Sequence, residues 1–113
     1  MNITAEVYGH AVIMNPKGDL TEDTLAVFGR AVDHHLEGDQ VIDVLINLEE
    51  VPFVDSAGME YLLTLQDKLA EKLGQVKLIK PDENVRKILE ITRLASTFET
   101  FDDLPHAVKA LQT

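Results

Sequence analysis

Asp55 and Ser56 are the residues best placed for chemistry, in the segment 49–59 between an apolar run and a leucine-rich run. We expect Ser56 at a helix N-terminus, where free backbone N–H groups and the positive end of the helix dipole would stabilise an attached phosphate. That phosphate would add about −1.5 to −2 charges, so a protein docked there would meet repulsion and desolvation. The acidic neighbours that would add to this repulsion are Asp55, Glu49, Glu50 and Glu60.

Two other interpretations apply to the same residues. In the first interpretation, Ser and Asp before the helix are ordinary N-caps, and Gly58 only allows close packing of the turn. A catalytic serine is disfavoured, because Ser56 lacks the Gly-x-Ser-x-Gly elbow and the sequence places no histidine to activate it. We therefore expect no enzymatic activity, and the residues alone leave both the cap and the modified hydroxyl open.

His34 and His35 are candidates for a metal site, next to Asp33 and Glu37. Adjacent helical residues point about 100° apart, and Glu37 is only two positions from His35, so these side chains do not converge on one ion. A solvated helix face is the better interpretation. We expect no metal and no cofactor, since the chain has no cysteine and no Gly-rich phosphate loop with its lysine.

The elements before this segment follow from turn and cap signals. Residues 5–15 alternate loosely around Gly9, which predicts a hairpin of two short strands, and residues 16–19 form a turn. Thr21 is the expected N-cap of a first helix that carries Glu22 and Asp23 in its first turn. The apolar residues of that helix, which we expect to end at Gly38, are Leu25, Phe28, Val32 and Leu36.

Residues 41–48 are too apolar for a half-exposed strand and predict a central strand covered on both faces. A second helix should follow and end at Gly74. Residues 76–79 predict a short strand, Asp82 and Glu83 begin a third helix, and residues 98–101 form a last strand before a final helix capped by Asp102 or Asp103. The apolar stripe of the second helix is Met59, Leu62, Leu65, Leu69 and Leu73.

The predicted order is therefore β-β-α-β-α-β-α-β-α. It indicates one α/β domain over residues 1–113, with helices packed on a mixed, mostly parallel sheet.

Composition excludes several classes of partner. The 113 residues include twenty acidic and ten basic side chains, for a formal charge of −10. Nucleic acids and anionic membrane surfaces require the opposite sign, and no apolar run is long enough for membrane insertion. The charge would instead steer a partner with a basic face. Without a secretory signal at Met1, the expected location is the cytoplasm.

Residues 48–63, LEEVPFVDSAGMEYLL, resemble the signature of STAS domains of the anti-sigma factor antagonist family. The similarity extends to Gly18-Asp19-Leu20, the strand 41–48, and the segments 81–89 and 91–94. It implies a STAS fold in which the serine after the aspartate, Ser56, is phosphorylated by a partner that is both anti-sigma factor and serine kinase. The unphosphorylated form would bind that partner and free a sigma factor, and a phosphatase would reset it.

The resemblance also implies a docking surface. Asp55 would help to present Ser56, and Gly58 would let the partner backbone come close. The remaining implied contacts are Thr21, Asp23, Ala57, Met59 and Tyr61. Two departures stand out. Thr21 replaces an Asp found in some relatives, and Arg93 stands where relatives usually have Gly. If that turn needs a positive φ, Arg93 costs some strain or the turn is built differently. A second hypothesis is a constitutive STAS-like scaffold subunit, for example of a lipid-transport assembly, that is never phosphorylated.

Overall fold

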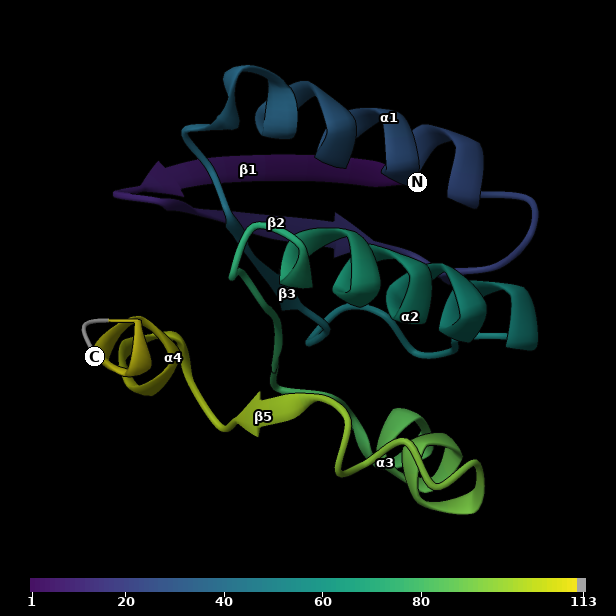
Figure 1. The fold of residues 1–113 in the computed structure, drawn as a ribbon. Coiled ribbons are helices and arrows are strands. Elements are labelled where there is room, and N and C mark those ends of the chain that lie inside the picture. The colour runs from purple at the N-terminus through teal and green to yellow at the C-terminus, as the bar shows by residue number, and fades with distance from the viewer. Residues whose placement is uncertain (112–113) are drawn as a thin grey trace.

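The computed structural model describes residues 1–111, which form a five-stranded sheet in the order β1-β2-β3-β4-β5 (Figure 1). β1 and β2 pair antiparallel, and β2 to β5 run parallel. The strands are β1 (Asn2–Tyr8), β2 (Ala11–Lys17), β3 (Asp43–Asn47), β4 (Val76–Ile79) and β5 (Glu99–Phe101). The helical segments are α1 (Leu25–Leu36), the 3-10 turn η1 (Glu37–Asp39), α2 (Ser56–Ala70), α3 (Glu83–Ile91) and α4 (Leu104–Ala110). The predicted α/β class and element order are confirmed, while residues 112 and 113 of the expected domain lie outside the described range.

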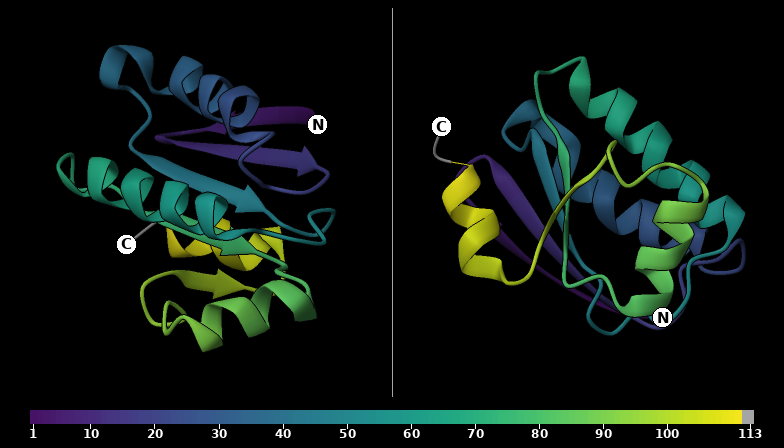
Figure 2. Two further views of the ribbon diagram at one scale, coloured as in Figure 1. Left: turned by 90° about the vertical axis from the view of Figure 1, so that its right-hand side faces the viewer. Right: turned by 90° about the horizontal axis from the view of Figure 1, so that it is seen from below.

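The helices cover the two faces of the sheet unequally (Figure 2). α1, α2 and α3 pack on one face and enclose the larger core, whereas α4 lies alone on the other face over a smaller core. This arrangement follows from the alternation of side chains along each strand, which sends neighbouring residues to opposite faces.

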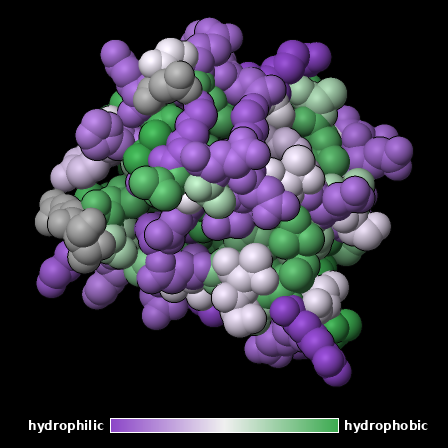
Figure 3. Space-filling model, viewed as in Figure 1, coloured by the Kyte–Doolittle hydropathy of each residue, from purple (hydrophilic) through white to green (hydrophobic). Residues whose placement is uncertain are grey.

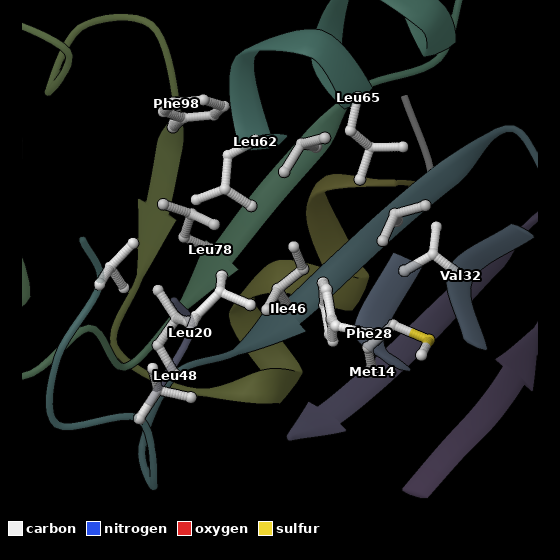
Figure 4. Close-up of a cluster of buried hydrophobic side chains, with 14 of the residues drawn as sticks. Met14, Leu20, Phe28, Val32, Ile46, Leu48, Leu62, Leu65, Leu78 and Phe98 are labelled. Atoms are coloured by element: carbon white, nitrogen blue, oxygen red, sulfur yellow. The ribbon is translucent and has the colours of Figure 1, made fainter. Parts of the chain in front are cut away.

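β3 is the centre of the sheet, as the sequence predicted. Ile46 lies in the larger core and Leu45 in the smaller one, and both are fully buried. In the register of the parallel strands Met14, Ile46 and Leu78 stand side by side, so the larger core continues across β2, β3 and β4 (Figure 4). A strand buried on both faces needs apolar residues at successive positions, which explains Val44, Leu45 and Ile46.

The first helix begins later than expected. Its N-cap is Thr24 and not Thr21, so Glu22 and Asp23 precede the helix. The Thr24 hydroxyl accepts the Thr21 N–H at 3.0 Å and donates to the carbonyl of Asp19 at 2.8 Å. These bonds form a turn over residues 21–24, and the chain enters helical geometry only after it. The end of the helix agrees with the prediction, because Gly38 takes φ 81° just beyond Leu36.

The C-terminus of α2 differs from the expected glycine stop. Leu73 holds the left-handed conformation, with φ 64°, and its side chain is 91% exposed, so it does not extend the buried stripe. The Leu73 and Gly74 N–H groups donate to the carbonyls of Ala70 and Leu69, which is a Schellman motif. Gly74 serves packing instead: a Cβ there would lie 1.7 Å from the carbonyl oxygen of Ile42.

α3 ends in the same motif. Arg93 has φ 61°, and the N–H groups of Arg93 and Leu94 donate to the carbonyls of Glu90 and Leu89. Of the two alternatives left open for Arg93, this turn uses the positive φ, and a non-glycine residue adopts it.

Candidate functional site

Ser56 is the first residue of α2, and its side chain is exposed. Asp55 is the N-cap: its Oδ1 accepts the Gly58 N–H at 2.7 Å. The Ser56 hydroxyl forms no hydrogen bond with any other residue of the range 1–111. The N–H groups of Ser56 and Ala57 belong to the first turn and therefore have no intrahelical acceptor. The capping role thus belongs to Asp55, and the Ser56 hydroxyl stays accessible.

Asp55 also connects two loops. Its Oδ2 accepts the N–H of Glu22, 33 positions away, at 3.0 Å. We call residues 18–24 the β2–α1 loop and residues 48–55 the β3–α2 loop. Three backbone hydrogen bonds add to this link: Gly18 N to Glu50 O at 3.0 Å, Leu20 N to Phe53 O at 2.9 Å, and Asp55 N to Leu20 O at 3.2 Å. The two loops therefore form one surface around Ser56.

Gly58 is buried between α2 and the β2–α1 loop. A Cβ at this position would lie 2.5 Å from the carbonyl oxygen of Leu20 and 2.8 Å from Cγ1 of Val54. The expectation that Gly58 also admits the backbone of a partner stays a prediction. The glycine is required because the chain's own β2–α1 loop occupies that space.

Met59 and Tyr61 point away from the exposed rim. Met59 is 4% exposed and belongs to the larger core, and its expected contact with a partner stays a prediction. Tyr61 is half-buried and packs edge-on against Phe28, with ring centroids 5.8 Å apart. It also lies 3.6 Å from the position that a Cβ on Gly29 would occupy. Tyr61 therefore joins α2 to α1 and does not border Ser56.

The Tyr61 hydroxyl is buried without a hydrogen-bond partner among the described residues. Burial raises the pKa of this phenol far above its ordinary value, and the carboxylate of Asp33 raises it further. The hydroxyl stays neutral at physiological pH.

The other expected docking residues lie on the two loops and the start of α2. Thr21 and Ala57 are half-buried and Asp23 is exposed. Glu60 follows Ser56 by one helical turn on the exposed side of α2. Of the predicted acidic neighbours, Glu49 and Glu50 are paired with Lys80 at 3.5 Å and Lys17 at 3.6 Å. The acidic side chains that share a groove lining with Ser56 are Asp55 and Glu60.

An open apolar groove of about 450 Å³ lies between α2 and α3 and reaches Ser56, and sequence reasoning did not find it. The space-filling view shows apolar surface between these helices (Figure 3). The groove is lined by Phe53, Val54, Asp55, Ser56, Met59, Glu60, Leu63, Ile88 and Thr92. The signal that could have revealed it is Phe53, a large aromatic residue in a loop, which is 46% exposed.

The site offers an exposed hydroxyl and hydrogen-bonded loops. Among the described residues, neither a histidine nor a lysine lines the groove that includes Ser56. Among the side chains that the structure describes, no group of three or more His, Asp or Glu is arranged to hold a metal ion. His34 and His35 lie ring to ring on α1, with centroids 5.3 Å apart. The arrangement suits modification and docking.

Comparison with known proteins identifies a family. Residues 2–107 match the family model described as the STAS domain. Among curated proteins, the anti-sigma F factor antagonist of Paenibacillus polymyxa is 21% identical, with 99% of this chain and 97% of that protein covered.

Solved structures of similar proteins have the same fold. A Thermotoga maritima protein, described as a candidate anti-sigma factor antagonist, superimposes with TM-score 0.90 at 18% identity, with 98% of this chain and 95% of that one covered. SpoIIAA, an anti-sigma factor antagonist of Bacillus, superimposes in its unphosphorylated form with TM-score 0.84, 20% identity, and coverage of 98% and 96%. Its phosphorylated form gives TM-score 0.75, 19% identity, and coverage of 97% and 99%. At these identities the structures establish the fold.

None of the helices in residues 1–111 has the length and apolar character needed to cross a bilayer.

Proposed function

The chain belongs to the STAS domain family, and on this premise we propose that it is a phosphorylation-switched anti-sigma factor antagonist. Its unphosphorylated form binds an anti-sigma factor that is also a serine kinase, and a sigma factor is released. Phosphorylation of Ser56 ends this binding, and a phosphatase restores it. The reaction and its catalysis belong to the kinase, so this chain acts as a binding protein, and we place it in the cytoplasm.

One observation carries the proposal: Ser56 is exposed at the first position of α2, while Asp55 takes over the capping of that helix. A serine that capped the helix would have its oxygen engaged with backbone N–H groups. Here the oxygen is available to a phosphoryl donor, and its modification leaves the cap of α2 in place. The switch can therefore act without unfolding the domain.

The phosphate would end binding through charge and volume at the point of closest contact. A kinase must bring the anionic phosphates of its nucleotide against the Ser56 hydroxyl. After transfer, a phosphoserine with about −1.5 to −2 charges faces the nucleotide phosphates that remain. On its other side it faces Asp55 and Glu60. Like charges in a closed contact cost several kcal/mol, which is sufficient to release the partner.

Asp55, Thr21, Asp23 and Ala57 have positioning and contact roles in this proposal. Asp55 fixes the two loops to each other, so Asp23 and Thr21 present a surface next to Ser56 that is formed before the partner arrives. Preorganised surfaces bind more tightly because less conformational freedom is lost on association.

The test uses the two serines of the chain. The full-length protein is incubated with a candidate anti-sigma factor kinase and Mg-ATP, and the modified residue is mapped by mass spectrometry. We expect phosphate at Ser56 and none at Ser96, an exposed serine outside the site. A kinase that binds this chain in the presence of ATP, yet leaves Ser56 unmodified, would refute the proposal and favour a constitutive scaffold.

Binding measurements complete the test. Calorimetry should show that Ser56→Asp weakens the kinase complex by about tenfold or more. Ser56→Ala should bind normally and remain bound when ATP is added. The matched control, Ser96→Asp, adds the same charge away from the site and should change neither affinity nor release.

A further inference from the structure

We propose that the groove between α2 and α3 is a docking site for an apolar segment of a partner protein that also carries basic residues. This inference deepens the proposed function, on which it rests, because it states the chemistry of the same partner. The groove adjoins the modified residue, since Ser56 and Asp55 form part of its lining.

The groove surface is apolar along its length. Phe53 is 46% exposed at the end near Ser56, Leu63 and Ile88 are half-buried along the walls, and Met59 closes the floor. Ile91, one turn beyond Ile88 on α3, is 80% exposed and extends the apolar surface. Exposed apolar residues that gather around a groove, unlike scattered ones, are typical of surfaces that another molecule covers.

The acidic charge of the groove indicates which kind of partner binds there. The two ionisable side chains that line the groove, Asp55 and Glu60, are both acidic. The whole chain has a formal charge of −10. A second copy of this chain would bring the same acidic surface and be repelled, and an anionic lipid surface would be repelled for the same reason. An apolar segment with Lys or Arg beside its apolar residues complements both the apolar surface of the groove and its two acidic side chains.

The groove and the Ser56 hydroxyl have separate roles in partner binding. The groove holds apolar side chains and sets affinity, whereas Ser56 faces the nucleotide of the kinase and responds to phosphorylation. Affinity for the groove segment therefore does not require that Ser56 be modifiable, and the two ideas can fail independently.

Two synthetic helical peptides of equal length serve as the probe. They share leucines at positions i, i+3, i+4 and i+7, and differ in having either lysine or glutamate at the flanking positions. Nuclear magnetic resonance titration of the full-length protein should show saturable binding of the lysine peptide, with shifts at Phe53, Leu63, Ile88 and Thr92. The glutamate peptide should bind about tenfold more weakly or not at all.

Matched variants locate the contact. Phe53→Ala should weaken binding of the lysine peptide by about tenfold, because truncation of an aromatic residue in a contact removes a large part of its affinity. Val27→Ala, an exposed apolar change on α1 away from the groove, should have no effect. Glu60→Lys should weaken the lysine peptide, whereas Glu71→Lys, which makes the same charge change just beyond the C-terminus of α2, should not.

The outcomes separate the inference from the proposed function. Ser56→Ala should bind the lysine peptide as the unaltered protein does, so absence of phosphorylation in cells would leave this result standing. Equal binding of the two peptides, shifts outside the groove, or no binding at millimolar peptide would overturn the inference. Sedimentation equilibrium that shows a dimer, lost in Phe53→Ala, would overturn it in favour of a second copy.

Discussion

Replacing Asp55 by alanine separates the two structural tasks of this carboxylate. The change removes the N-cap of α2, formed by Oδ1 with the Gly58 N–H, and the link from Oδ2 to the Glu22 N–H. Loss of a side-chain N-cap costs about 1 kcal/mol. The second bond is exposed, so water replaces part of it and its loss adds about 1 kcal/mol. We therefore expect the free energy of unfolding to fall by about 2 kcal/mol.

The matched control is Asp82→Ala. Asp82 caps α3 through a hydrogen bond from the Val85 N–H at 2.9 Å and has no second link of this kind to another described residue. This variant should lose about 1 kcal/mol. At about 4 °C per kcal/mol for a domain of this size, the midpoint of thermal unfolding should fall by about 8 °C for Asp55→Ala and about 4 °C for Asp82→Ala.

Urea unfolding followed by circular dichroism measures both free energies, and hydrogen exchange at the Glu22 amide tests the loop link directly. Exchange at Glu22 should become faster in Asp55→Ala and stay unchanged in Asp82→Ala. If the two variants lose equal stability and Glu22 exchanges at the same rate in both, then Asp55 is only a cap, and our account of a preformed two-loop surface is wrong.

Further predictions concern two residues with a positive φ, one tightly packed glycine and one buried hydroxyl. Leu73→Gly and Arg93→Gly should each raise the free energy of unfolding by about 0.5–1 kcal/mol, as measured in urea, because both residues hold a positive φ that glycine adopts without strain. A loss of stability in both would show that the side chains contribute contacts we have not recognised. Gly58→Ala should lower stability by about 1–3 kcal/mol, since its Cβ would lie 2.5 Å from the Leu20 carbonyl; an alanine tolerated without cost would contradict this packing. Tyr61→Phe should raise stability by about 1 kcal/mol by removing a buried hydroxyl that has no partner within the described chain. Because the folded state raises the pKa of Tyr61, stability should fall as the pH rises above about 10, where the unfolded chain ionises, and it should fall less in Tyr61→Phe.

The beginning of α1 shows why local signals fail near the site. Thr21 followed by two acidic residues is a good helix start by local rules, yet the helix begins at Leu25. The reason is distant in sequence: Leu20 pairs with the β3–α2 loop and the Glu22 N–H binds Asp55. Partners more than thirty positions away override the local preference, and no window along the chain contains them.

The sequence by itself determined the order of strands and helices, the central place of β3, and the position of Ser56 at the start of α2. Each of these follows from local patterns: period-2 or period-3.6 hydrophobicity, a continuous apolar run, and an aspartate placed for a cap. Such patterns act through bonds and contacts within a few residues, and can therefore be recognised in a single chain.

Tertiary structure alone decided which of the suspected residues are exposed and which are buried. In the packed structure Gly58 and Met59 are buried, and Tyr61 packs against Phe28 of α1. Asp55 accepts the Glu22 N–H, and a groove lies between α2 and α3. Exposure depends on how separate elements pack, and an apolar residue follows the same helical pattern whether it lines a core or a groove. Only the packed arrangement distinguishes the two.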